Sequence, residues 1–427
     1  MVNRPRPAMR VAAALAALAV ASCKSGSNEG SAGQGGQAQA APSKITIGAT
    51  LPLTGAEARI GGFFKEGYDL AFEEVKAKGG LDLGGKKVPV TLTLLDDTST
   101  QATAVSLADR LINSDRVDFL LGTYASHLVQ AQSGVAEQNK VPYVNGGGGA
   151  SDIYRKGYKY LFGLIAPVEL LGTTLMQWVD GEQKAGKLPK PARIALLWEN
   201  TSHGQDFRKG VSEFAQKSNG GFTVAVDESF ELNGKDFGAL LGKVKAADAQ
   251  LYLVDAHLPD YITMHRQYIA AGLCHPIESY GARGSEKSAV DALGKEGVSY
   301  VLSAVWWNAQ VAQKNPQAKA FVDAFQARYK KAPEWFQALA YESARALFLA
   351  IEKAGTNDRD KVRDALASLD VPSLLPGGKL RFPADKGQQV QNSFVVQQNM
   401  PDGGAPIIFP ADAATAQGVA PNPRCKR

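Results

Sequence analysis

The residues able to do covalent or metal chemistry are few, and their spacing forms no catalytic motif. The 427-residue chain has three cysteines and five histidines, and the histidines lack the HExxH-type spacing of many zinc sites. No order of Ser, His and Asp, or of Cys and His, indicates a nucleophilic triad. The four glycines at 146–149 lack the Gly-Lys-Ser/Thr of a phosphate loop, and no G-x-G-x-x-G follows the first predicted strand. We therefore expect no enzyme, cofactor or metal site.

Composition is that of an ordinary globular protein. With 44% hydrophobic and 21% charged residues, the chain has enough apolar side chains for a core, and its length favours two or more domains. The net charge of +5 is mild for this length and forms no basic block, which disfavours nucleic-acid binding.

The beginning of the chain indicates export. Arginines precede a short apolar run at 11–20, which ends in Val20-Ala21-Ser22-Cys23. This ending resembles the lipobox of bacterial lipoproteins, which implies a signal peptide at 1–23 and lipidation of Cys23. An ordinary signal peptide cleaved near Ala21, with an incidental cysteine, is the alternative. Residues 24–43 are mostly Gly, Ser, Ala and Gln, and predict a flexible linker. Either reading places the protein in the periplasm or at the cell surface.

Two cysteines remain after Cys23. In an oxidising compartment Cys274 and Cys425 could pair and tie the C-terminal tail to the body of the protein. The alternative is one buried thiol and one thiol in a frayed tail.

The elements that must position any site follow a regular alternation. Ile45, Ile47 and Ala49 alternate with small polar residues, which predicts a strand. A polar loop and an amphipathic helix that includes 64–75 follow it. In open parallel sheets, ligands bind where such loops leave the carboxyl ends of the strands.

This unit is repeated along the chain, which predicts an α/β fold with parallel sheets covered on both faces. Further strands are expected at 88–95, 117–122, 141–144, 193–198, 222–226, 250–255, 277–280, 298–305, 379–382 and 393–398. Further helices are expected at 104–112, 126–138, 170–178, 204–218, 236–247, 259–271, 321–329, 335–354 and 358–369.

A set of motifs carries a family resemblance. In order they include IGATLPLTG, VDFLLGTYAS, NKVPYVNGG, RIALLWENTSHG and ALAYESA. Together they resemble the type I periplasmic-binding-protein fold, within it the Leu/Ile/Val-binding group that delivers ligands to ABC transporters. The similarity covers about 44–398.

The resemblance implies two Rossmann-like lobes joined by a three-strand hinge and closing over a ligand. Carried onto this sequence, the N-terminal lobe comprises 44–165 plus 308–372, and the C-terminal lobe comprises 166–307 plus 373–427. The implied partners are a small carboxylate-bearing ligand, such as a branched-chain or other amino acid or a related organic acid, and ABC permease subunits. The predicted lipid is the link to the membrane. A ligand-sensing module with a separate signalling partner shares this fold and is the alternative.

In the first lobe, the resemblance implies contacts to a ligand carboxylate. The loop Gly122 to Ser126 matches a family loop that holds a carboxylate, which suits Ser126 at a helix N-terminus. Ser126 as a simple N-cap is the alternative. The run 145–151 matches a second carboxylate loop, with Gly147, Gly148 and Gly149 in its core. Tyr124 could form part of the wall of the ligand cleft.

In the second lobe, the residues at the positions that the resemblance assigns to ligand binding differ in type from those of the amino-acid-binding members of the family. His203 replaces a tyrosine that covers the ligand and could stack on the ligand or hydrogen-bond to it; a solvated loop histidine is the alternative. Asp255 and His257 end a predicted strand, where they contact ligand or pair with each other. Arg283 stands where an acidic residue usually holds the ammonium, which puts a zwitterionic ligand in doubt unless Asp255 supplies the negative partner. A surface salt bridge is the alternative for Arg283. Trp306 is a cleft wall or a core residue.

Overall fold

The computed structural model describes residues 42–425. The predicted signal peptide, Cys23 and the linker up to residue 41 lie outside the described residues, so these predictions stay untested. Within the described part of the chain, no helix combines the length and the apolar character needed to span a membrane.

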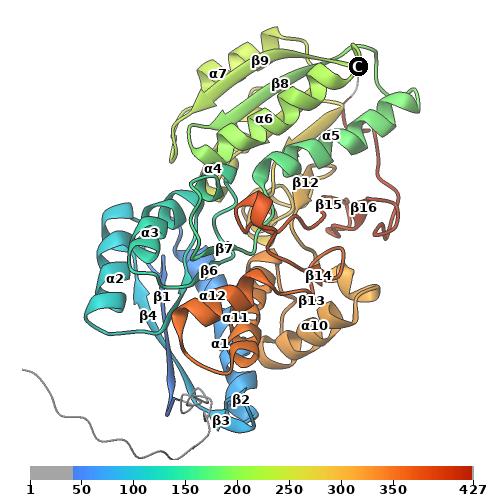
Figure 1. The fold of residues 1–427 in the computed structure, drawn as a ribbon. Helices are drawn as coiled ribbons and strands as arrows, with labels where there is room; N and C mark the ends of the chain where they lie inside the picture. The colour runs from blue at the N-terminus through green and yellow to red at the C-terminus, as the bar shows by residue number, and fades with distance from the viewer. Residues whose placement is uncertain (1–41, 426–427) are drawn as a thin grey trace, which may run out of the picture. The chain divides into compact units, whose positions relative to one another are not determined.

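The first sheet has five parallel strands in the order β4-β1-β5-β6-β7 (Figure 1). Its strands are β1 (Ile45–Leu51), β4 (Val90–Asp96), β5 (Phe119–Gly122), β6 (Tyr143–Asn145) and β7 (Leu161–Gly163). All residues of β5, β6 and β7 are buried. Burial on both faces is typical of parallel strands between two helix layers, and it explains their nearly continuous apolar sequence.

Helices from both ends of the described chain cover this sheet. They are α1 (Ala58–Ala77), α2 (Gln101–Asn113), α3 (Ser126–Gln138), α4 (Ser151–Tyr154), α10 (Pro316–Tyr329), α11 (Trp335–Ala354) and α12 (Arg359–Ala367). Figure 1 shows the orange helix α11 beside the blue helix α1, and the two pack together. Gly67 permits this approach, because a Cβ there would lie 2.5 Å from the Gln337 carbonyl oxygen.

The second sheet has seven strands in the order β16-β15-β12-β11-β10-β8-β9. They are β8 (Ala192–Glu199), β9 (Phe222–Phe230), β10 (Leu251–Asp255), β11 (Ile277–Tyr280), β12 (Leu302–Val305), β15 (Val395–Gln398) and β16 (Ile407–Phe409). β8 to β12 pair in parallel, whereas β15 and β16 join antiparallel.

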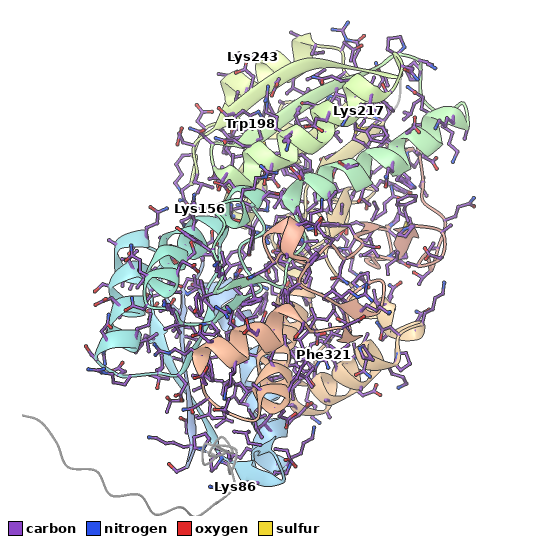
Figure 2. The ribbon with its side chains drawn as sticks, in the orientation of Figure 1. Lys86, Lys156, Trp198, Lys217, Lys243 and Phe321 are labelled. Atoms are coloured by element: carbon purple, nitrogen blue, oxygen red, sulfur yellow. A yellow bond between two sulfur atoms is a disulfide. The ribbon has the colours of Figure 1, made fainter. Side chains whose placement is uncertain are left out.

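Five helices accompany the second sheet. They are α5 (Val168–Lys184), α6 (Ser202–Lys217), α7 (Gly238–Ala246), α8 (Leu258–Ala270) and α9 (Lys287–Leu293). Figure 2 labels Trp198, Lys217 and Lys243 on β8, α6 and α7, and Phe321 on α10. The α/β class with two lobes and parallel sheets is thereby confirmed.

The differences from the sequence prediction concern short elements. The strand expected at 298–305 begins only at Leu302, because the preceding residues form turns. The sequence reading missed α4, α9, β7, β16 and the hairpin of β2 (Leu81–Leu83) and β3 (Lys86–Val88). The remaining small elements are β13 (Val371–Pro372), β14 (Lys379–Leu380), η1 (Ala309–Gln313) and η2 (Ala384–Lys386).

The strands of the first sheet lie between residues 45 and 163 of the chain, and those of the second between 192 and 409. The residues at which the chain crosses from lobe to lobe stay a prediction.

A disulfide joins the C-terminal tail to the second lobe. Cys274 and Cys425 are bonded, with their Cα atoms 5.3 Å apart and a sequence separation of 151 residues. The Asn422 amide also donates to the Pro276 carbonyl at 2.8 Å. The tail therefore lies against the segment just before β11.

Replacing Cys425 with Ser should lower the free energy of unfolding by about 2–5 kcal/mol, because a long loop in the unfolded chain would no longer be closed. Denaturant unfolding without reductant measures this change. Wild-type protein in reductant is the matched control and should match the variant. A variant as stable as oxidised wild type would contradict a stabilising role.

Candidate functional site

The carboxyl ends of strands from both sheets meet at one cluster of buried side chains. Tyr124 follows β5 of the first sheet. In the second sheet, Glu199 ends β8, Asp255 ends β10, Arg283 follows β11 and Trp306 follows β12. All five are buried. This is the edge at which open parallel sheets bind ligands.

Arg283 links the two lobes at the centre of this cluster. Its Nη2 donates to the Tyr124 hydroxyl, and its Nη1 donates to Glu286 Oε1 at 2.8 Å. The guanidinium lies 5.2–5.6 Å from the ring centroids of Phe336, Trp335 and Tyr124. Burial alone would lower the pKa of Arg283, but Tyr124 and Glu286 raise it above its usual value. The side chain is therefore a buried, permanent cation with internal partners.

This geometry changes the interpretation of Arg283. A surface salt bridge was one sequence-based alternative, and it is wrong because only 4% of the residue is exposed. The pairing with Glu286 balances the charge within the protein. Arg283 therefore gives no reason by itself to doubt a zwitterionic ligand.

Two histidine–carboxylate pairs lie beside Arg283. His257 Nδ1 is 2.5 Å from Glu199 Oε2, which also accepts from the His257 amide at 3.0 Å. His203 Nδ1 is 2.7 Å from Asp255 Oδ2. Asp255 and His257, which the sequence suggested might pair with each other, thus take different partners. On the first-lobe side, Glu57 Oε1 is 3.7 Å from His257 Nε2.

The electrostatics of the His257–Glu199 pair favour its charged form. Burial alone would lower the pKa of His257, but the charges of Glu199 and Glu57 raise it to about 9. Burial alone would raise the pKa of Glu199, but the charge of His257 and its hydrogen bond lower it to about 2.

Ser126 holds the first-lobe loops together. It is the first residue of α3 and not its N-cap, so the N-cap interpretation is wrong; Ala125 takes that position. The Ser126 Oγ accepts from the amides of Gly149 at 3.1 Å and Ala150 at 3.3 Å. Its own hydroxyl proton remains to be donated.

The glycine run is explained by close packing. A Cβ at Gly147 would lie 2.1 Å from the Thr123 carbonyl oxygen, and one at Gly148 would lie 2.7 Å from Val129. The Gly148 amide donates to Asn145 Oδ1, and the Gly149 amide donates to Ser126. The amides expected to face a ligand at these two positions already have acceptors inside the protein.

Trp306 is a buried core residue whose ring also borders the polar cluster, so both sequence-based interpretations apply. Its Nε1 donates to the Ala166 carbonyl at 2.8 Å, and its ring lies 4.7 Å from that of Trp335 and 6.3 Å from that of His203. The hydrogen bond fixes an aromatic face against the polar cluster.

A crevice of about 120 Å³ adjoins the cluster, lined by residues that include Glu286, Trp307, Glu334 and Trp335. Two of its polar atoms, Glu286 Oε2 and Trp335 Nε1, are buried and have no hydrogen-bond partner among the described residues. Buried polar groups without partners are costly, so this acceptor and this donor are candidates for contacts with a bound molecule. His257 Nε2 of the same cluster is a third buried atom without a partner among the described residues.

Sequence reasoning missed several members of the site: Glu57, Glu199, Glu286, Trp335 and Phe336. Two of them carried a signal in hindsight. Glu286 lies three residues after Arg283, and Glu199 ends a predicted strand. Of the residues predicted, Tyr124, His203, Asp255, His257, Arg283 and Trp306 come together. The first-lobe loop residues instead have internal partners: Ser126 accepts from the Gly149 amide, and the Gly148 amide donates to Asn145.

A second polar contact joins the lobes outside the cluster. The Ser151 amide of α4 donates to Asp206 Oδ2 of α6 at 2.6 Å. The described conformation is therefore one in which the lobes touch.

Comparisons with known proteins bear on this arrangement. The periplasmic binding protein family model matches residues 44–405. A Leu/Ile/Val-binding protein homolog 8 from Brucella abortus (strain 2308) is 26% identical over 384 residues, which cover 88% of this chain and 93% of the relative. A leucine-, isoleucine-, valine-, threonine- and alanine-binding protein from Pseudomonas aeruginosa is 28% identical over 355 residues, covering 83% and 89%.

Solved structures share the fold. The leucine-binding protein LivK from Thermotoga maritima superposes with a TM-score of 0.74 at 24% identity, covering 85% of this chain and 97% of that one. A solute-binding protein of an ABC transporter from R. palustris, in complex with benzoate, gives 0.71 at 20% identity, covering 89% and 98%.

Replacing Glu286 with Gln should lower the free energy of unfolding by about 3–5 kcal/mol, because the buried Arg283 cation would lose its charged partner. Thermal and denaturant unfolding without added ligand measure the change. Asp227→Asn is the matched control, since it breaks the more exposed Arg208–Asp227 pair, where a loss below about 1 kcal/mol is expected. Equal losses in the two variants would contradict this account of Arg283.

Proposed function

The chain belongs to the periplasmic binding protein family, and from that premise we propose that it is an exported solute-binding protein of an ABC importer. It captures a small amino acid between its lobes and presents the closed form to permease subunits. Aliphatic side chains are the favoured class. Ligand binding closes the lobes because the closed state offers contacts that the open state lacks.

The observation that carries the proposal is the pair of unsatisfied polar atoms at the crevice. Glu286 Oε2 is an acceptor and Trp335 Nε1 is a donor. An α-amino acid has both complements, an ammonium that donates and a carboxylate that accepts. A simple organic acid would satisfy the indole and leave the Glu286 oxygen without a donor.

The surroundings support the same class of ligand. Trp335 lines the crevice, and its ring packs against those of Phe336 and Trp306. Aromatic surface of this kind suits an apolar ligand side chain. The curated relatives named above as Leu/Ile/Val-binding proteins support branched-chain amino acids as the first to be tested.

Leucine should raise the melting temperature of the protein, because a ligand that binds only the folded state stabilises it by mass action. 4-Methylpentanoate, which lacks the ammonium, and isopentylamine, which lacks the carboxylate, should bind far more weakly. Valine, isoleucine, threonine, alanine and benzoate complete the panel, measured by thermal shift and calorimetry.

Trp335→Phe serves as the site variant in the same assay, because it removes the indole donor and keeps an aromatic ring. Its leucine affinity should fall about 10- to 100-fold, the equivalent of one charge-assisted hydrogen bond. Trp198→Phe is the matched control, because the Trp198 indole bonds Asp227 away from the crevice. Tighter binding of benzoate or 4-methylpentanoate than of leucine would argue against an amino-acid ligand and for an organic acid.

The proposal includes a lipid at Cys23, which rests on the lipobox-like sequence before it. Wild-type protein expressed in a Gram-negative host should sediment with membranes and need detergent for release, whereas Cys23→Ser should be less firmly attached. Cys425→Ser, which leaves the lipobox intact, is the control and should still sediment. Equal distribution of the wild-type and Cys23→Ser proteins would count against the anchor.

A further inference from the structure

Three side chains of metal-ligating type gather at the carboxyl ends of two paired strands. β8 and β10 run in parallel with Asp255 opposite Trp198, so Glu199 and Asp255 end side by side. His203 lies in the first turn of α6, four residues after Glu199. One ligand atom from each of Glu199, His203 and Asp255 lies within 4.8 Å of the other two.

The distances suit a single ion after small side-chain movements. His203 Nδ1 is 2.7 Å from Asp255 Oδ2 and 3.9 Å from Glu199 Oε1. Bonds from zinc to nitrogen or oxygen of about 2.0–2.2 Å let two ligands of one ion lie up to about 4 Å apart. Three protein ligands would leave a coordination position for water or for a carboxylate of a bound solute.

Neighbouring groups hold the first of these ligands in place. Glu199 Oε1 accepts from the Thr201 hydroxyl at 2.8 Å, and Glu199 Oε2 bonds the backbone amide and the ring of His257. Hydrogen-bonded supports of this kind orient metal ligands in proteins.

The charge of the cluster also fits a divalent cation. Only 0% of Glu199 and 1% of Asp255 is exposed to solvent. The negative charge of a buried carboxylate must be compensated by a nearby positive charge or by hydrogen-bond donors. Because His257 already pairs with Glu199, a bound cation would mainly compensate the charge of Asp255 and would bind His203 in its neutral form. Mixed imidazole and carboxylate ligands favour zinc over magnesium or calcium.

We propose that Glu199, His203 and Asp255 form a binding site for a divalent transition-metal ion, with zinc as the ion tested first. Its ligands come from the second lobe alone and do not include Glu286 or Trp335, the two residues whose unpaired atoms carry the amino-acid proposal.

The test uses the full chain without a histidine tag, stripped with chelator and titrated with zinc chloride in a calorimeter. We expect the wild-type chain to bind one equivalent of zinc. The zinc affinity of His203→Gln and of Asp255→Asn should be at least about tenfold lower, because loss of even a supporting residue around a metal site lowers metal affinity by about that factor. His127→Gln and Asp227→Asn, which change the same residue types elsewhere, should bind zinc as wild type does. Melting curves without metal establish that each variant is folded.

Cobalt(II) bound to the wild-type protein gives a readout that needs no variant. An intense visible absorption, displaced by zinc, is expected for a site of low coordination number with imidazole and carboxylate ligands. Absence of stoichiometric zinc binding, or wild-type affinity in both His203→Gln and Asp255→Asn, would overturn the proposal. Leucine binding measured on the same preparation keeps this result separate from the proposed transport function.

Discussion

The burial of one cation between two lobes is the constraint on which the site depends. A guanidinium does not lose its proton in a protein, so Arg283 must be solvated by water or by fixed partners. Glu286 supplies one partner from the same lobe, and the Tyr124 hydroxyl supplies another from the opposite lobe. In the described conformation these protein groups, one from each lobe, take the place of water around Arg283.

Around that cation, the second lobe pairs its charges before any ligand is considered. His257 with Glu199 and His203 with Asp255 are matched within the lobe. Among the described residues of this cluster, three buried polar atoms keep no hydrogen-bond partner, namely His257 Nε2, Glu286 Oε2 and Trp335 Nε1. Selectivity in such a site depends less on its total charge than on which donors and acceptors the protein leaves unpaired.

The sequence was sufficient for the architecture because the apolar periodicity and the order of motifs agree over most of the chain. It failed on three-residue strands such as β2 and β16, which are too short to show a period. It placed His203, Asp255 and Arg283 correctly near strand ends, since that follows from local order. It did not reveal that Arg283 would meet Tyr124 or that His257 would lie near Glu57, because these contacts arise only through tertiary packing. The glycines at 147–149 look functional in sequence, but the contacts of their hypothetical Cβ atoms show a requirement for space.

The bond between Cys274 and Cys425 encloses more than the tail. The covalent loop that it closes contains α11, which packs against α1 beside the first sheet, as well as β15 and β16 of the second sheet. A protease that cuts the backbone once anywhere inside this loop therefore leaves both fragments joined by the sulfur bridge. An exported protein is exposed to proteases and cannot be resynthesised at its site of action. A molecule cut once inside this loop would keep its two fragments covalently joined.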